Sequence, residues 1–237
     1  MWLIAEYQAA TLFSFRVGIA TSSGAKTLFL PTPFAIRTAL LDAAIRTGGL
    51  VAGQSAFAWI KSLSIAVRPP ERVIVTNLFA KILKPTRKEE ADEPMARSIA
   101  FREYAQLEGP VALAFRVPEQ QVQDLKELLV QINYFGKRGS FFQLLDVPRE
   151  SAELPADYRL LDGMGLSSEG MPQLPAAIPL GVIQVMDDWG ENLTFAKVNI
   201  YSDEKITLGK DRVRKNVVLP YRLVRSSKGY SLYERIP

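Results

Sequence analysis

The stretch that decides the fold runs from Pro118 to Val147 and reads PEQQVQDLKELLVQINYFGKRGSFFQLLDV. Apolar residues in its first half recur at helical spacing, with polar residues on the opposite face: Val122, Leu125, Leu128, Leu129 and Ile132. This spacing predicts an amphipathic helix that packs one face on a core. The end of the stretch, FFQLLDV, predicts a strand, so the segment between the two must connect a helix to a strand.

The connecting segment, NYFGKRGS, places two glycines and two cations between aromatic residues. Gly136 and Gly139 permit positive φ angles and a close approach of backbone amides to a ligand, and Lys137 and Arg138 supply positive charge. Flanking aromatic rings could stack on bases, although alternate ones must face the core: Tyr134, Phe135, Phe141 and Phe142. Two interpretations are open here, an ordinary helix-to-strand turn and a backbone cradle for a phosphate group.

Upstream of this stretch, the chain is predicted to begin with a strand and a helix. Aromatic and β-branched residues with partial alternation predict a strand over Glu6 to Val17. In the segment LPTPFAIRTALLDAAIRTGG, Thr32 can cap a helix, Pro33 suits its first position, and the pair Gly48-Gly49 ends it. A short second helix is predicted from Ser55 to Lys61.

The middle of the chain is predicted to be extended, with a charge-rich insertion. Extended segments are interrupted at Pro69 and Pro70. Lys81 to Arg102 contains KILKPTRK, EEADEP and RSIAFR, a composition typical of a projecting hairpin or a loop rather than a core element. Strand character returns at Pro110 to Val117.

The last third of the chain is predicted to be an irregular connection followed by strands. Pro148 to Pro179 is rich in Pro and Gly and has no hydrophobic period. Strands are then predicted around Val182 to Met186, Leu193 to Tyr201, Val217 to Val224 and Tyr230 to Ile236.

This order of elements is close to the split β-α-β plan of a ferredoxin-like domain. We therefore predict an α+β fold with two parts. The first is a ferredoxin-like (RRM-like) domain over residues 1–147, with a hairpin insertion at about 78–106. The second, residues 148–237, is an irregular linker and a β-rich extension packed on the first domain.

Composition excludes several kinds of chemistry. The 237 residues include no Cys and no His, which removes disulfides, thiolate metal sites, Ser-His-Asp and Cys-His arrangements and most zinc sites, so no metal site is predicted. Neither GxxxxGK[ST] nor GxGxxG occurs, so no nucleotide cofactor is predicted. The N-terminus has no basic lead and reaches Glu6 before an apolar run of membrane length, which predicts a soluble cytoplasmic protein with no membrane partner.

Positive charge is concentrated near the C-terminus. The net charge is +4, yet Lys205 to Arg235 alone holds nine Lys or Arg and two Asp or Glu. Such a segment suits a polyanion, and a solvated charged face would look similar. Adjacent carboxylates, Asp187 and Asp188, would face opposite sides of a strand, so we predict that they form a turn before Trp189-Gly190.

Three segments resemble the Cas-five family, CRISPR-associated protein five, of the repeat-associated mysterious protein (RAMP) superfamily. FSFRVGIATSSGAKTLFLPTPFAIRTALLDAAIRTGG is similar to the family's first strand, Ser/Thr-rich loop and proline-led first helix. The loop from Phe135 to Ser140 is similar to the family's Gly-rich loop after its second helix. VVLPYRLVRSSKGYSLYERI looks like the family's closing strand pair.

The resemblance implies a subunit that caps one end of a Cascade effector by holding the 5′ handle of the CRISPR RNA. Its partners would be that RNA, the large subunit and the first backbone subunit. The insertion would match the family's thumb-like hairpin, and its acidic half, Glu89 to Glu93, could equally meet a basic partner. Arg16 or Arg37 could instead make an internal ion pair. The RNA-binding residues implied by this resemblance are Gly136, Lys137, Arg138, Gly139, Ser140, Thr21, Ser22, Ser23, Lys26, Arg16, Arg37, Lys84, Arg87 and Lys88.

Three functional hypotheses follow. The leading one is a non-catalytic CRISPR RNA-binding subunit, because some relatives cut their guide RNA with a site that includes His and this chain has none. The second is a metal-independent endoribonuclease of the same superfamily that uses Tyr and Lys as general acid or base. The third is an assembly subunit whose basic C-terminal face meets an acidic protein.

Overall fold

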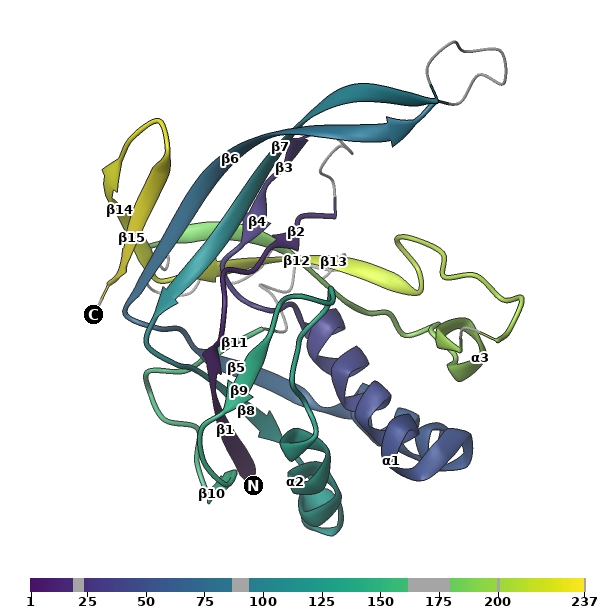
Figure 1. Cartoon of the computed structure of the whole chain (residues 1–237). Helices are drawn as coiled ribbons and strands as arrows, with labels where there is room; N and C mark the ends of the chain where they lie inside the picture. Colours follow the sequence, from purple (N-terminus) through teal and green to yellow (C-terminus); the bar gives the residue numbers. More distant parts are fainter. Residues whose placement is uncertain (19–23, 87–93, 162–179, 200, 237) are drawn as a thin grey trace, which may run out of the picture.

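The computed structural model describes residues 1–18, 24–86, 94–161, 180–199 and 201–236. The fold is a mixed α/β arrangement of several antiparallel sheets with helices at one end (Figure 1). None of its described helices is long and apolar enough to cross a membrane.

The first sheet is built around β1 (Trp2–Ala9). On one side β1 pairs with β8 (Val111–Arg116), which pairs in turn with β5 (Ser64–Arg68). On the other side β1 pairs with β9 (Phe142–Leu144) and β10 (Arg149–Ser151). All these pairings are antiparallel. In the resulting order, β9-β1-β8-β5, the first strand of the chain lies between two strands that come much later in the sequence.

Helices cover one face of this sheet, α1 (Pro33–Ser62) and α2 (Val122–Val130), the latter preceded by the 3-10 turn η1 (Glu119–Gln121). Alternation along the strands sends one set of side chains into the main core with the helices: Leu3, Ala5, Tyr7, Ile65, Val67, Leu113 and Phe115. The predicted amphipathic helix at 118–132 is confirmed, because its apolar residues are buried in that core.

The opposite face of the sheet is covered by the chain itself. Small side chains, Ala66, Ala112 and Ala114, form a second cluster with Ile4 and the buried ring of Tyr158. Tyr158 belongs to the segment that ends in β11 (Arg159–Leu160), which pairs with β5. The side chains of this cluster are at most 4% exposed.

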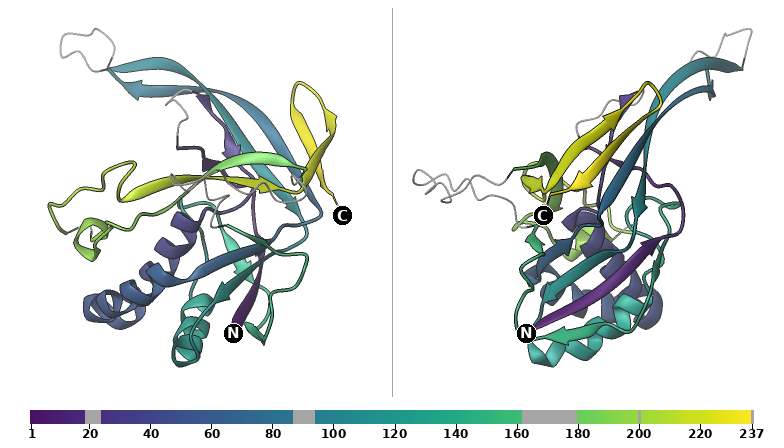
Figure 2. Two further views of the ribbon diagram at one scale, coloured as in Figure 1. Left: turned by 180° about the vertical axis from the view of Figure 1, so that it is seen from behind. Right: turned by 90° about the vertical axis from the view of Figure 1, so that its left-hand side faces the viewer.

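A second sheet is built on a long hairpin of β6 (Arg72–Pro85) and β7 (Met95–Glu108). Pairing is continuous from Arg72 opposite Glu108 to Pro85 opposite Met95. Both views in Figure 2 show the far ends of these strands extending beyond the rest of the fold. The expected hairpin is therefore present over the described residues. Its first strand begins at Arg72, six residues before the expected start of the insertion at about 78.

The C-terminal strands complete this second sheet and add a ribbon. β15 (Tyr230–Arg235) pairs with β6 and with β14 (Tyr221–Ser226), and the short β3 (Gly24–Ala25) pairs in parallel with β7. A separate ribbon of β12 (Val182–Trp189) and β13 (Arg212–Leu219) packs on α1. Two further short strands, β2 (Phe15–Arg16) and β4 (Thr27–Leu28), pair with each other.

The element α1 consists of two helical segments that meet at a kink. Thr32 accepts a hydrogen bond from the Ala35 N–H at 3.2 Å, as its N-cap position predicts. Gly49 interrupts the helix with a φ of 77°, but helical geometry resumes and continues to Ser62. The prediction that the first helix ends at Gly48-Gly49 and that a separate helix follows is therefore confirmed, although the second helical segment begins before Ser55. Ala56, Phe57 and Ile60 give this second segment an apolar face that packs on the same core.

Other boundaries also differ from the predictions. The first strand ends at Ala9, and only Phe15–Arg16 of its predicted second half is extended in a sheet. The predicted strand over Leu193 to Tyr201 contains instead the short helix α3 (Phe195–Val198), whose Lys197 N–H donates to the Thr194 hydroxyl at 3.4 Å. The predicted strand over Val217 to Val224 is divided at Pro220, because proline cannot donate to a sheet ladder.

Candidate nucleic-acid interface

The Gly-rich loop is a tight turn on the surface. Gly136 has a φ of 63° and Gly139 a φ of 99°, and both lie in the left-handed region that favours glycine. The Phe135 N–H donates to the Ser140 carbonyl at 3.3 Å, and the Ser140 N–H donates to the Lys137 carbonyl at 3.1 Å. These bonds close the turn and leave the side chain of Lys137 exposed at its tip.

Aromatic rings beneath the turn fix it to the core. Phe135 lies edge-on to Tyr7 and to Phe142, with ring centroids 5.2 Å apart in each pair. The Tyr7 hydroxyl donates to the Leu129 carbonyl at 2.8 Å, and burial raises the pKa of Tyr7 far above its usual range, so it remains a donor. Of the four flanking aromatic residues, Phe135 and Phe142 are buried and Phe141 is 47% exposed. Phe141 is therefore the ring best placed for base stacking.

The Ser140 side chain is buried, and its N–H is used inside the turn. Ser140 therefore supports the loop from within, and neither its side chain nor its N–H is presented to a ligand.

The turn geometry gives a testable prediction. We expect Gly139→Ala to lower the free energy of unfolding by about 1–2 kcal/mol, because a Cβ strains a residue held at positive φ even where space is available. Gly229→Ala is the matched control, since Gly229 also has no atom near an added Cβ but lacks a positive φ. Urea unfolding of both variants measures the difference, and equal stabilities would show that the loop tolerates another conformation.

The loop forms one wall of a surface groove. A Cβ on Gly136 would lie 3.6 Å from the Ala35 Cβ and 3.7 Å from the Phe15 ring, so the turn packs directly against the start of α1 and β2. A pocket of about 310 Å³ opens here, and an adjoining pocket of about 340 Å³ shares Asp187 with it. We call these two pockets the basic groove, because the cations that line it are Arg16, Lys137, Arg212 and Arg214.

The basic groove contains more cations than acidic side chains. The Arg212 guanidinium lies 4.2 Å from the centroid of the Phe34 ring and forms an ion pair with Asp187. Arg214 is largely exposed and donates to the Gly18 carbonyl at 3.3 Å. Residues at the N-terminus of α1, including Thr32, also line the groove, and the positive end of the helix dipole favours an anion. Asp187 is the acidic side chain that lines both pockets, so the groove is net positive.

Sequence reasoning found half of these cations individually. Arg16 and Lys137 were predicted site residues, and the structure brings them into one groove. Arg212 and Arg214 were recognised only as part of the basic C-terminal segment. Their position beside the Gly-rich loop depends on the pairing of β13 with β12 and on the packing of that ribbon against α1, neither of which the local sequence reveals.

Three further predicted cations that the structure describes do not line the basic groove. Lys26 is exposed between β3 and β4, where its carbonyl accepts the Val17 N–H at 3.2 Å. Arg138 is exposed at the tip of the Gly-rich loop. Lys84 lies on β6 opposite Ala96, far along the hairpin. Other predicted site residues fall outside the described residues: Thr21, Ser22, Ser23, Arg87 and Lys88.

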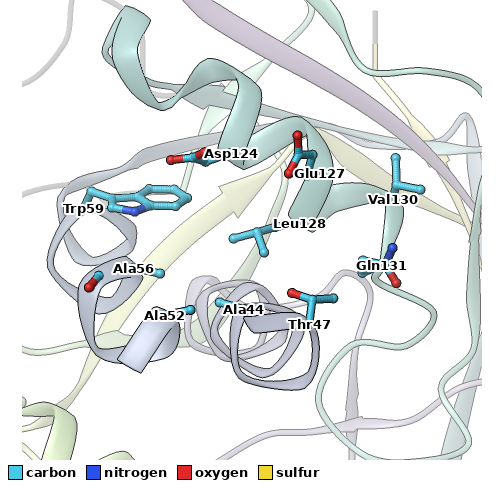
Figure 3. A pocket seen from close by; sticks show the side chains of 11 residues that line it. Ala44, Thr47, Ala52, Ala56, Trp59, Asp124, Glu127, Leu128, Val130 and Gln131 are labelled. Carbon is cyan, nitrogen blue, oxygen red and sulfur yellow. The ribbon is translucent and has the colours of Figure 1, made fainter. Parts of the chain in front are cut away.

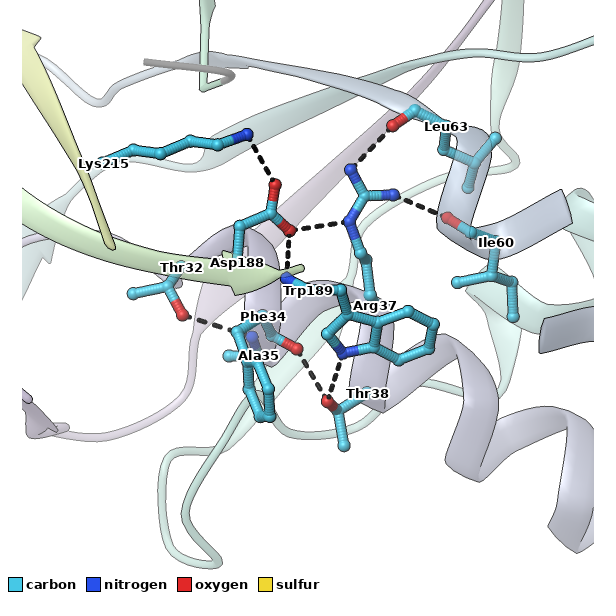
Figure 4. A network of polar contacts seen from close by, with 10 residues as sticks. All are labelled: Thr32, Phe34, Ala35, Arg37, Thr38, Ile60, Leu63, Asp188, Trp189 and Lys215. Atoms are coloured by element: carbon cyan, nitrogen blue, oxygen red, sulfur yellow. Dashed lines mark hydrogen bonds and ion pairs between the residues drawn. The ribbon is translucent and has the colours of Figure 1, made fainter. Parts of the chain in front are cut away.

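Arg37 is not a surface residue, and its prediction as an RNA contact was wrong. Its guanidinium is buried, with Nε donating to Asp188 Oδ1 at 2.8 Å, Nη1 to the Ile60 carbonyl at 2.6 Å and Nη2 to the Leu63 carbonyl at 2.8 Å (Figure 4). These bonds join the start of α1 to its end. The alternative of an internal ion pair is the one observed.

The two adjacent carboxylates also differ from the prediction. Asp187 and Asp188 lie inside β12 rather than in a turn. Asp187 pairs with Arg212 in the basic groove, whereas Asp188 is buried and also accepts from Lys215 Nζ at 3.1 Å and from the Trp189 N–H at 2.7 Å. No group of three or more metal-ligating side chains occurs within the described ranges.

The fold and this groove define a mixed α/β protein with a surface suited to a polyanion. No protein-family model matches the chain. A curated relative, "CRISPR-associated protein Cas5" from Archaeoglobus fulgidus, is 28% identical over 136 residues, which cover 57% of this chain and 56% of the relative. The match therefore spans about half the length of that relative. The resemblance to the Cas-five family read from the sequence is thereby confirmed over the matched stretch.

Two solved structures are also similar. A CRISPR protein from Archaeoglobus fulgidus aligns with 100% of this chain and 92% of its own, at 11% identity and a TM-score of 0.41. A chain of a CRISPR RNA-guided surveillance complex aligns with 92% of this chain and 90% of its own, at 17% identity and a TM-score of 0.46.

Proposed function

We propose that this protein is a non-catalytic RNA-binding subunit of a type I-like CRISPR effector (Cascade) that holds the 5′ handle of the guide RNA in the basic groove. The observation that carries the proposal is the convergence of Arg16, Lys137, Arg212 and Arg214 beside the N-terminus of α1. Phosphates of a single strand would lie along these cations, and the exposed Phe141 ring would stack on a base. The homology to a Cas5 protein supports the assignment to a CRISPR effector.

The sheet topology supports a ferredoxin-like domain. The spatial order β9-β1-β8-β5, with α1 and α2 on one face, is the order that a ferredoxin-like domain over residues 1–147 requires. RRM domains stack bases on the exposed face of their sheet. Here that face is covered by the segment that carries Tyr158, so the RNA would lie along the loops at the edge of the sheet instead. The pairing of β15 with β6 supports the packing of the C-terminal extension on this domain.

The hairpin is the proposed thumb-like contact with a backbone subunit. Phe79 and Phe101 face each other across β6 and β7 with ring centroids 6.2 Å apart, and both rings are exposed. Leu83 and Ile99 extend the same face and are also exposed. Exposed apolar clusters of this kind mark interaction surfaces, so they support a protein contact at this face. The large subunit remains the second proposed partner.

A charge reversal at the loop tests the proposal. We expect Lys137→Glu with Arg138→Glu to weaken binding of the repeat-derived 5′ handle RNA at least about tenfold, because each lost phosphate contact removes counterion release. Both side chains are exposed, so thermal unfolding should be nearly unchanged. Fluorescence anisotropy with labelled RNA measures the affinity.

The matched control places the same charge change elsewhere. Arg116→Glu with Lys126→Glu alters cations at the end of β8 and on α2, and neither cation lines the basic groove. This variant should bind RNA nearly as well as the original protein. Equal losses in both variants would contradict a site at the Gly-rich loop, and unfolding of the first variant would show that the loop is only structural.

The endoribonuclease alternative needs an available Tyr or Lys. Tyr7 and Tyr221 are buried, their hydroxyls donate to backbone carbonyls, and burial raises the pKa of each far above its usual range. Neither is therefore suited to proton transfer. Incubation of the pure protein with repeat RNA in chelator should leave the RNA intact, whereas specific cleavage abolished by one Tyr or Lys substitution would overturn the non-catalytic proposal.

A further inference from the structure

A groove between α1, on both sides of its bend at Gly49, and α2 forms another concave surface. It encloses about 580 Å³ and shares no lining residue with the basic groove (Figure 3). Its α1 wall is made of small side chains, Ala44, Ala52 and Ala56, and Leu128 of α2 points into the space between them. Packed helices normally fill such space with interdigitated side chains, so the alanines leave the groove open.

Apolar side chains extend this groove onto the surface. Trp59 lines one end and Val130 the other, where Val130 is 56% exposed. Leu50 and Val51 follow directly after the bend at Gly49 and are 48% and 80% exposed. An apolar groove with an exposed apolar margin is typical of a surface that a partner covers.

The charged side chains that line the groove are both acidic. Asp124 and Glu127 line its α2 wall, and neither takes part in an ion pair within the described residues. Glu127 accepts only a neutral bond from Gln123 Nε2, at 2.9 Å. The nearby cations are already engaged, since Arg46 pairs with Asp42 and donates to the Gln131 carbonyl, and Lys126 pairs with Glu150.

We propose that this groove docks a segment of a partner protein that inserts an aliphatic side chain between Trp59 and Leu128 and places a Lys or Arg beside Asp124 and Glu127. The negative margin disfavours nucleic acid. It also disfavours residues 162–179 of the chain itself, whose sequence holds two acids and no Lys or Arg. The inference does not depend on RNA binding by the basic groove.

Fluorine NMR of the protein labelled with 5-fluorotryptophan tests this docking site. The chain has three tryptophans, and Trp59→Phe assigns the resonance that reports on the groove. The probe is a synthetic amphipathic peptide of Leu and Lys, and its counterpart has Glu in place of every Lys. We expect the Leu-Lys peptide to shift the Trp59 resonance saturably, while the Leu-Glu peptide has no effect.

Variants of Asp124 and Glu127 show whether these carboxylates are responsible for binding of the Leu-Lys peptide. Asp124→Lys with Glu127→Lys should weaken the Leu-Lys peptide at least about tenfold. Asp124→Asn with Glu127→Gln, a milder pair, guards against loss of fold and should weaken it less. Glu119→Lys with Glu153→Lys is the matched control, because both residues are exposed and lie outside the groove, and it should leave the affinity unchanged.

Several results would overturn the proposal. An equal response to the Leu-Glu peptide would show an apolar pocket without charge selection, and an unchanged affinity in both carboxylate variants would mean the same. A Trp59 resonance that shifts with protein concentration alone would assign the groove to a second copy of the chain. A resonance that never responds to the Leu-Lys peptide would show that the groove is closed to partners.

Discussion

Replacing Arg37 by Met is expected to lower the free energy of unfolding by about 3–5 kcal/mol, the range for breaking a buried ion pair by removal of one partner. The pair with Asp188 is almost completely shielded, with side-chain exposures of 5% and 3%. Met fills a similar length but leaves the Asp188 carboxylate with Lys215 and the Trp189 N–H as its remaining partners. The Leu63 carbonyl also loses the bond from Arg37, and the Ile60 carbonyl keeps only the Leu63 N–H as a donor.

The same helix provides the matched control. Arg46 pairs with Asp42 at 2.8 Å, the same distance as in the buried pair, but both side chains are substantially exposed. Arg46→Met should therefore lower stability by about 0.5 kcal/mol or less, because an exposed pair spaced four residues apart on a helix contributes little. Urea titrations of both variants would compare them. Similar midpoints would contradict the view that burial, rather than pairing itself, makes Arg37 important.

The Arg37 network also explains how the basic groove keeps its shape. Asp188 lies on β12 beside Asp187, which faces Arg212 in the basic groove. By holding Asp188, Arg37 fixes β12 against α1, and β12 in turn sets the position of β13. Loss of Arg37 should therefore reduce RNA binding indirectly, through displacement of Arg212 and Arg214.

The features that could be predicted from the sequence depend on residues close together in the chain. The spacing from Val122 to Ile132 identified α2, because four of the five apolar residues lie on the core face of one helix and Ile132 follows two residues after its end. The two glycines of the loop indicated backbone positions with positive φ, because few other residues adopt that conformation.

Long-range contacts account for what sequence reasoning missed. In the sequence, nothing near Arg37 distinguishes it from an exposed helix cation. Its partner, Asp188, lies 151 residues later in the chain. Residues 193–201 have strand composition, yet Thr194 caps a short helix there and Phe195 contacts the Phe57 ring. The groove residues Arg212 and Arg214 join the loop through the packing of a ribbon on α1. Tertiary contacts override local preference at each of these positions.

The salt dependence of RNA binding should separate the basic groove from the wider basic face. We expect the triple variant Arg16→Gln, Lys137→Gln and Arg214→Gln to bind 5′ handle RNA about 100-fold more weakly at 0.1 M salt. Each phosphate contact on a single strand contributes about 0.7 to the slope of log affinity against log salt, so three lost contacts should reduce that slope by about 2. Anisotropy titrations over a range of salt concentrations give both quantities.

Three cations of the C-terminal hairpin form the control: Arg222, Arg225 and Lys228, each changed to Gln. They are exposed on or between β14 and β15, and Arg222 already pairs with Glu234, whose pKa is lowered chiefly by that hydrogen bond. If RNA occupies the basic groove, this variant keeps nearly the full slope, although its net charge changes as much. If instead the C-terminal face serves an acidic protein and RNA binds by overall charge alone, the two triples lose affinity equally. That equality would remove the basis for placing RNA beside the Gly-rich loop, since only position distinguishes the two sets of cations.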